Sequence, residues 1–314
     1  MPDPDRSRTL IAVLGPTASG KTDLALFLAA YFDTEILSAD SRQFYRGMDI
    51  GTAKPTPAQR REAVHHFIDV LDVDEPYSAG RYEDDALQRL DAIFRTRDHA
   101  VLVGGSGLYV NAVLQGIDPF PDIPDEVRQQ VVDWYRTDGI DTLRAELKAR
   151  DPKHYVEVDL DNPRRLMRAL EVCLTTDSSY SDLRTAQPAE RSFRTVKVAL
   201  HHERPALYAR IEQRVDEMLA TGLVDEARAL WPHRRERALE TIGYKEIFAH
   251  FAGEHDLQEA VRLIKRNTRR YAKRQLTWLR NDPDLHWFTA ATPPAEIAAV
   301  IERLIEDDSD RADQ

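Results

Sequence analysis

The chain has 314 residues, 42% of them hydrophobic, which is enough apolar material for a sizeable core and argues against wholesale disorder. The formal net charge of −11 argues by itself against a nucleic-acid partner, and the one cysteine, Cys173, excludes an internal disulfide and suits a reducing compartment. The N-terminus lacks the apolar run of a signal peptide, and no stretch approaches the length of a membrane span, so we expect a cytoplasmic protein.

The first predicted elements enclose a glycine-rich loop. Residues 9–14 (TLIAVL) read as a buried strand and residues 22–32 as an apolar helix, and the run GPTASGKT between them fits the phosphate-loop pattern G-x-x-x-x-G-K-[ST]. Backbone N–H groups of such a loop point at an anion, the lysine meets the terminal phosphate and the last hydroxyl is placed to ligate Mg²⁺. The predicted phosphate-binding residues are Gly15, Pro16, Thr17, Ala18, Ser19, Gly20, Lys21 and Thr22, with Thr22 as the metal ligand.

Strand-like and helix-like segments continue to alternate along the chain. A strand at 35–40, a helix at about 78–98 and a strand at 100–105 follow the phosphate loop, and this rhythm predicts an α/β fold in which a parallel, P-loop NTPase-like sheet is flanked by helices. The rhythm breaks at three prolines within 116–124, and a strand returns at 196–200. We therefore predict a helical insertion domain at 119–195 and a catalytic core formed by 1–118 and 196–314.

The predicted strand ends indicate which kind of phosphate-loop protein this is. Kinases and ATPases of this class carry an acid at the end of a second core strand, whereas the strand at 100–105 runs into GGSG with no carboxylate. The core strand that ends in an acid is EILSAD, which ends at Asp40 and is followed by Ser41, Arg42 and Gln43. The carboxyl edge of the sheet is where α/β proteins place their sites, although Asp40 also suits a turn or an N-cap.

Two basic tracks stand out from the acidic average. Arg262, Arg266, Arg269, Lys273 and Arg280 are spaced to lie along one face of a helix, and residues 261–280 contain no Glu or Asp. The second track, Arg164, Arg165 and Arg168, lies in the insertion. A solvated helix face is the common fate of such runs, but basic tracks on an acidic chain also suit a phosphodiester backbone met at one face.

At this point the sequence resembles the tRNA dimethylallyltransferases, also called tRNA isopentenyltransferases. The phosphate loop is shared with many proteins, whereas DSRQFYRGMDIGTAKP (40–55) and AKRQLTWLR (272–280) are far more specific. Further matching stretches occur in the family's order: HHFIDVLDVDEPYSAGRYEDDA (65–86), LVGGSGLYVNAVLQG (102–116), NPRRLMRALEV (162–172), RIEQRVDEML (210–219) and ETIGYKEI (240–247).

The resemblance implies transfer of a dimethylallyl group from dimethylallyl diphosphate to the exocyclic amine of the adenine on the 3′ side of the tRNA anticodon, with release of diphosphate. Its implied catalytic residues are Asp40 as base, Ser106, which replaces a common threonine, and Arg214, which neutralises the leaving group; without the resemblance, Arg214 reads as a surface arginine paired to Glu217 or Asp216. The implied cofactor is Mg²⁺, and the implied partners are dimethylallyl diphosphate and the anticodon stem-loop of tRNA, with no membrane and a monomeric enzyme.

The implied tRNA-binding positions fall in four regions and at one separate arginine. They are Asp40, Ser41, Arg42, Gln43, Ser106, Arg128, Arg164, Arg165, Leu166, Met167, Arg168, Glu240, Thr241, Ile242, Gly243, Tyr244 and Lys245. The chain departs from the family after RALEV, where it lacks the usual Gly-Lys pair and reads CLTTDSSYSDL.

Three other functions compete with this interpretation. An adenylate isopentenyltransferase, which uses a free nucleotide, has no need of the insertion or the basic tracks. A P-loop kinase or ATPase conflicts with the acid-free strand end at 104–107. A non-catalytic RNA-binding module has no use for the loop at 15–22.

Overall fold

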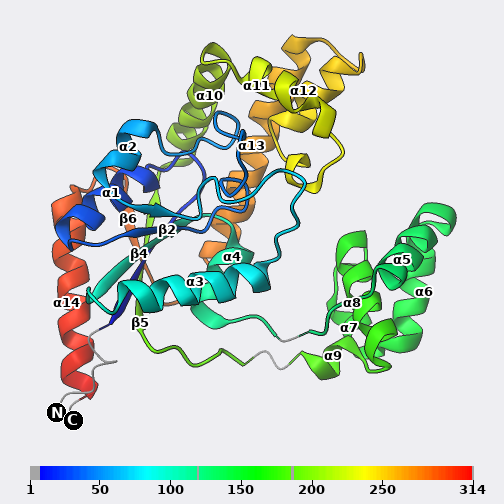
Figure 1. Ribbon diagram of the computed structural model, residues 1–314, viewed down its shortest axis with the longest axis horizontal. Coiled ribbons are helices and arrows are strands. Elements are labelled where there is room, and N and C mark those ends of the chain that lie inside the picture. The colour runs from blue at the N-terminus through cyan, green and yellow to red at the C-terminus, as the bar shows by residue number, and fades with distance from the viewer. Residues whose placement is uncertain (1–7, 119, 185–186, 313–314) are drawn as a thin grey trace. The chain divides into compact units, whose positions relative to one another are not determined.

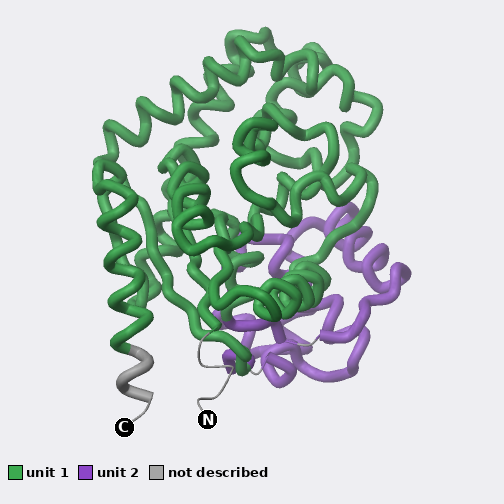
Figure 2. Tube along the Cα trace, turned by 60° about the vertical axis from the view of Figure 1, so that its left-hand side comes forward, with its two compact units in different colours: residues 1–114, 190–314 green, residues 115–189 purple. Residues whose placement is uncertain are grey.

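The computed structural model describes residues 8–118, 120–184 and 187–312, which divide into two compact units (Figures 1 and 2). Unit 1 comprises residues 1–114 and 190–314, and unit 2 comprises residues 115–189. The chain enters and leaves unit 2 through neighbouring segments, since the Ala189 N–H donates to the Gln115 carbonyl at 2.7 Å. Unit 2 is therefore an insertion into unit 1.

Unit 1 is built on one sheet whose strands all run parallel. The strands are β1 (Thr9–Leu14), β2 (Ile36–Ser38), β3 (His65–His66), β4 (His99–Gly104), β5 (Arg194–His201) and β6 (Leu285–Thr289). Their spatial order is β3-β2-β4-β1-β5-β6, so β1 is central and pairs with β4 and β5. The carboxyl ends of β1, β2, β4 and β5 consequently meet at one edge of the sheet.

Alternate residues of β1 belong to two separate cores. Leu10, Ala12 and Leu14 pack into the larger cluster, whereas Ile11 and Val13 pack into the smaller one. Helices α1 (Lys21–Tyr31) and α14 (Pro294–Ala312) cover the smaller core. The larger core lies under α3 (Ala79–Ile93), α4 (Gly107–Gln115), α10 (Arg204–Ala220), α11 (Leu223–Leu230), α12 (Tyr244–Phe251) and α13 (Leu257–Leu279). Both faces of the parallel sheet are thus covered, as its apolar strands require.

Short elements complete unit 1, and unit 2 is helical in its described residues. Unit 1 also contains α2 (Pro57–Glu62) and the 3₁₀ turns η1 (Trp231–His233) and η2 (Arg237–Leu239). Unit 2 contains α5 (Asp125–Asp138), α6 (Ile140–Arg150), α7 (Pro152–Glu157), α8 (Pro163–Thr176) and α9 (Tyr180–Leu183) around its own core of Val131, Leu143, Leu147, Leu166, Ala169 and Leu170.

The predicted fold class is confirmed, because the sheet is parallel, its central strand β1 leads into the phosphate loop, and helices flank it. Cys173 is buried, and its thiol is not part of a disulfide. None of the helices in the described part of the chain is long and apolar enough to span a membrane.

Candidate active site

The phosphate loop forms because two glycines take backbone conformations that other residues avoid. Gly15 follows β1 with φ +148°, where a Cβ would lie 2.8 Å from Ser19 Oγ, and Gly20 has φ +96° immediately before α1. The loop is held from outside: the His202 ring contacts the Ser19 carbonyl at 3.1 Å, and Arg210 Nε donates to the Ala18 carbonyl at 2.8 Å. The N-terminus of α1 therefore opens onto a fixed concave backbone suited to an anion.

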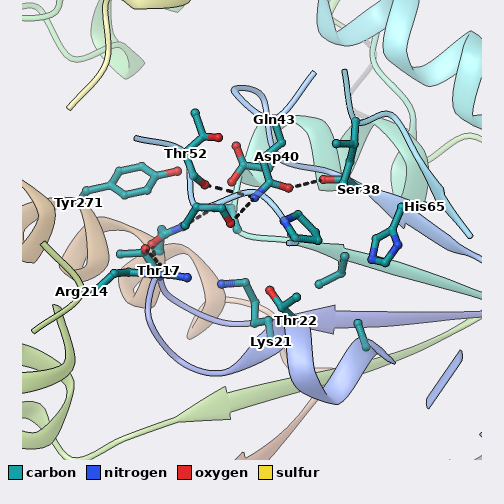
Figure 3. A pocket seen from close by; sticks show the side chains of 18 residues that line it. Thr17, Lys21, Thr22, Ser38, Asp40, Gln43, Thr52, His65, Arg214 and Tyr271 are labelled. Atoms are coloured by element: carbon teal, nitrogen blue, oxygen red, sulfur yellow. Dashed lines mark hydrogen bonds between the residues drawn. The ribbon is translucent and has the colours of Figure 1, made fainter. Parts of the chain in front are cut away.

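A pocket at this edge of the sheet gathers most of the predicted chemistry (Figure 3). Lys21 and Thr22 line it from the start of α1, Asp40 lines it from the end of β2, and Arg214 reaches it from α10. The other lining residues are Thr17, Ala25, Ser38, Gln43, Thr52, Ala53, Pro55, His65, Ile68, Val103, Gly104, Gly105, Tyr271 and Gln275.

Arg214 belongs to the site and not to the helix surface. It is only partly exposed, its Nη1 donates to Thr17 Oγ1 at 3.4 Å, and in Figure 3 its guanidinium points at the phosphate loop. Burial lowers its pKa, and the neighbouring charge of Arg210 lowers it further, whereas Asp40 opposes the shift. The alternative of a surface ion pair to Glu217 or Asp216 is therefore wrong.

Lys21 carries the strongest electrostatic signal of the loop. Burial, followed by the positive charge of Arg214, lowers its pKa to about 8, while Asp40 acts in the opposite direction. Its Nζ donates to the Pro16 carbonyl at 2.7 Å. Two partly buried cations whose pKa values are both lowered leave the pocket suited to an added anion.

Asp40 combines the two roles that the sequence left open. Its Oδ1 accepts from the Arg42 N–H at 3.0 Å, which is a turn contact, and the same carboxylate lines the pocket. Ser106 lies beside it but not among the lining residues: its Oγ accepts from the Ser41 N–H at 3.3 Å and donates to Ser41 Oγ at 3.4 Å. Asp40 Oδ1 thus fixes the orientation of the Asp40 side chain, while Oδ2 remains available to a substrate.

Two site residues from α13 were missed by the sequence analysis. Gln275 is 6% exposed; its Oε1 accepts from the Thr17 N–H at 2.8 Å and its Nε2 donates to the Gly105 carbonyl at 2.8 Å. Tyr271 points into the pocket in Figure 3, and burial together with the charge of Asp40 raises its pKa to about 12, so the phenol is neutral at pH 7. Gln275 ties the phosphate loop to the loop after β4.

Glu226 is a third missed residue, and it positions the loop after β2. Its carboxylate accepts from the backbone N–H groups of Asp49, Ile50 and Gly51 at 2.7–2.9 Å and from Tyr244 Oη at 2.7 Å. The chain then turns so that the Thr52 and Ala53 carbonyls accept from Gln43 Nε2 at 3.2 and 3.3 Å. The sequence offered no signal for this contact, because Glu226 lies far along the chain on a charged helix.

The predicted tRNA positions are divided between the two units. Asp40, Gln43 and the segment around Glu240–Lys245 lie in unit 1, and Arg128 with the residues from Arg164 to Arg168 lies in unit 2. Several are exposed or partly exposed: Ser41, Arg42, Arg128, Arg164, Arg165, Met167, Arg168, Glu240, Thr241, Ile242 and Lys245.

Two of the predicted positions have buried side chains. Leu166 and Tyr244 are each 0% exposed, one in the core of unit 2 and the other against Glu226. A core leucine and a fully buried phenol present no side-chain surface to a partner, so the burial does not support side-chain contacts to RNA here, and the two positions stay predictions. Gly243 is also buried, with φ +99° before α12, so its part is to begin that helix.

The first basic track lies on α13, and only part of it is free of acidic partners among the residues that the structure describes. Its first half is neutralised by acids outside residues 261–280: Arg262 pairs with Glu259 of the same helix at 2.6 Å, Lys265 with Asp216 at 2.6 Å and Arg269 with Glu212 at 2.5 Å. The absence of acids within 261–280 did not reveal these partners, because Glu212 and Asp216 come from α10. Arg270, Lys273 and Arg280 are exposed and form no ion pair with any described residue.

No group of three or more His, Cys, Asp or Glu side chains is arranged to hold a metal ion within the described ranges. The sequence contains the adjacent histidines His65 and His66; His65 lines the pocket and His66 contacts Glu35 at 2.6 Å. His201 and His202 line a second, shallow cavity with Leu276, Arg280 and Trp287. The Thr22 hydroxyl and the Asp40 carboxylate are among the side-chain oxygens that line the pocket.

Comparison with known proteins agrees with the resemblance seen in the sequence. The family model described as IPP transferase matches residues 43–282. The chain is 46% identical over 282 residues to the tRNA dimethylallyltransferase of Christiangramia forsetii, an alignment covering 90% of this chain and 93% of that relative. The crystal structure of the full-length tRNA isopentenylpyrophosphate transferase of Bacillus halodurans superposes with a TM-score of 0.73 at 38% identity, covering 98% of this chain and 100% of that one.

A more distant structure supports the fold alone. A eukaryotic dimethylallyltransferase, solved acting on tRNA, superposes with a TM-score of 0.78 at 24% identity and covers 91% of this chain and 74% of that one.

Proposed function

The chain belongs to the IPP transferase family, and from that premise we propose that it is a tRNA dimethylallyltransferase: it moves the dimethylallyl group of dimethylallyl diphosphate to the exocyclic amine of the adenine 3′ of the anticodon. The observation that carries the proposal is one pocket in which Lys21, Arg214 and Asp40 converge. Two cations beside a phosphate loop suit a leaving diphosphate, and one carboxylate suits a proton acceptor.

The chemistry follows from these positions. The carbon–oxygen bond of the donor breaks as a carbon–nitrogen bond forms, and the electron pair leaves with the diphosphate. Lys21, Arg214 and the loop N–H groups meet the charge that develops there, where loss of one such contact costs about 3–4 kcal/mol of barrier. The amine loses its proton to Asp40. An adenine must leave its stack to reach this pocket, as unpaired loop bases can.

The residues present fit the proposed Mg²⁺. The Thr22 hydroxyl and the Asp40 carboxylate are oxygen donors that line the same pocket, and Mg²⁺ needs few protein ligands because it keeps waters and takes phosphate oxygens. Thr22 would hold it directly. Bound there, the ion would neutralise part of the diphosphate charge. The proposed enzyme is a monomer, and a tRNA substrate suits the cytoplasm.

One experiment tests the function. The protein is incubated with Mg²⁺, labelled dimethylallyl diphosphate and either a tRNA with adenine beside its anticodon or free AMP. We expect label in the tRNA and none in AMP. Label in AMP alone would make the chain an adenylate isopentenyltransferase, and ATP hydrolysis without any transfer would make it a P-loop ATPase.

A further inference from the structure

A short arginine-rich stretch in unit 1 is not explained by the pocket. Residues 231–239, hereafter the arginine segment, connect α11 to the turn before α12 and carry Arg234, Arg235 and Arg237. All three are exposed, and none pairs with a carboxylate among the described residues. The segment contains one acid, Glu236, so its net charge is positive on a chain of charge −11.

The arginine segment is held in place, unlike a loose charged loop. Ala238 and Leu239 are 3% and 1% exposed and anchor its end. The Arg234 guanidinium lies 4.6 Å from the centroid of the Trp231 ring and donates to the Trp231 carbonyl at 3.1 Å. Trp231 in turn packs edge-on against Phe248 and Phe251, at 5.5 and 5.6 Å. A guanidinium stacked on a fixed ring loses less freedom when it binds an anion.

The arginine segment is also joined to the catalytic edge of the sheet. Arg42, two residues after Asp40, donates from Nη1 to the Arg237 carbonyl at 3.2 Å. An RNA whose adenine base lies at Asp40 therefore has neighbouring phosphates within reach of these arginines. A single small anion has no need of three separate guanidinium groups along a strip, whereas a phosphodiester chain presents repeated charges.

We propose that the arginine segment binds the sugar–phosphate backbone of the RNA substrate, through Arg234, Arg235 and Arg237. This inference rests on the proposed function and adds a surface outside the pocket and outside the predicted tRNA positions. It contrasts with the first half of α13, where Arg262, Lys265 and Arg269 are already neutralised by neighbouring acids. Unpaired arginines that neutralise phosphates release the counterions condensed on the RNA, whereas arginines already paired with acids do not.

Two triple variants with the same change in net charge separate these surfaces. R234Q/R235Q/R237Q removes the arginine segment's charge, and R262Q/K265Q/R269Q removes the paired charge. The dissociation constant of an anticodon stem-loop RNA is measured from 50 to 300 mM salt. We expect the first variant to bind about tenfold more weakly near 100 mM and to lose about 2 from the slope of log K against log salt. The second should keep the wild-type slope.

Further measurements guard the interpretation. The lysine variant R234K/R235K/R237K keeps the charges and should retain most of the slope of log K against log salt. A loss of the slope through misfolding would affect this variant as well. Affinity for dimethylallyl diphosphate should stay unchanged in every variant. Equal losses in the two glutamine variants, or an unchanged slope in the first, would overturn the inference while leaving prenyl transfer intact. A wild-type protein that binds no RNA would overturn the inference and the proposed function together, which sets that failure apart.

Discussion

At the scale of single residues, Lys21 links pH to substrate binding. Its pKa of about 8 in the free site reflects burial and the charge of Arg214, and a bound diphosphate must raise that pKa by supplying the opposite charge. The protonated lysine is the binding form, so affinity is full below pH 8 and falls as pH rises above it. A terminal phosphate, whose second ionisation is near pH 6, is already ionised throughout this range.

We therefore expect the dissociation constant of dimethylallyl diphosphate to rise by up to about tenfold per pH unit above pH 8. Calorimetric titration from pH 7 to 9.5 measures it. Lys21→Arg, which stays charged throughout, is the matched control and should give a flat profile. A flat profile in the wild-type protein would mean that the Lys21 ammonium does not contact the diphosphate.

Asp40 permits a substitution that separates chemistry from structure. In Asp40→Asn the side-chain oxygen still accepts from the Arg42 N–H, so the turn survives, but the amide cannot take a proton. We expect the rate of transfer to fall by about 10²–10⁴ and RNA affinity to change little. Single-turnover kinetics and RNA binding on the same preparation check both parts. Turnover at the wild-type rate would exclude Asp40 as the base.

The site residues that the sequence patterns identified without the resemblance share one property: their chemistry is local. GPTASGKT and the acid ending EILSAD are legible because a strand and the loop after it are contiguous. Gln275 and Glu226 were not legible, because each acts on backbone far from it in sequence. A faint signal existed for Gln275, an uncharged polar side chain four residues after Tyr271 on the buried side of an otherwise basic helix.

At the scale of elements, α13 acts on the site through Gln275. Gln275→Met keeps the volume but leaves the Thr17 N–H and the Gly105 carbonyl without their partner, at about 1–3 kcal/mol for each buried group. We expect the KM for dimethylallyl diphosphate to rise about tenfold or more, with RNA affinity near wild type. Thr277→Ala on the exposed side of the same helix, where the hydroxyl bonds only to the Lys273 carbonyl, should change neither.

Steady-state kinetics with each substrate varied in turn makes this comparison, and melting curves monitor the fold. A loss of RNA affinity equal to the loss of donor affinity would show that Gln275 supports the whole helix and not the phosphate loop.

Among the elements, those with strong patterns were predicted and those set by pairing were not. The strand at residues 9–14 matches β1 because all six residues are buried and the five from Leu10 to Leu14 are apolar. The two-residue β3 and the mixed β6 carry no such pattern, since His65–His66 and Leu285–Thr289 become strands only by pairing with β2 and β5. For the same reason, the sequence did not predict the ion pairs between the acids of α10 and the basic residues of α13.

At the scale of the whole molecule, unit 2 has a hydrophobic core of its own, so the two units can unfold separately. In unit 2, Asp151 is 1% exposed and binds the starts of two helices: its Oδ1 accepts from the His154 N–H and from Ser181 Oγ, both at 2.8 Å, and its Oδ2 accepts from the Ser181 N–H at 2.7 Å. Removing this carboxylate leaves three donors without a buried acceptor.

We expect Asp151→Ala to destabilise unit 2 by about 3 kcal/mol and to weaken RNA binding, while donor binding in unit 1 persists. Amide hydrogen exchange should quicken within 115–189 and stay unchanged in β1 and α1. Asp159→Ala is the control, because that exposed carboxylate only accepts from the nearby Asp161 N–H. Faster exchange throughout unit 1, or loss of dimethylallyl diphosphate binding, would contradict the separation, because the phosphate loop and its supports all lie outside the insertion.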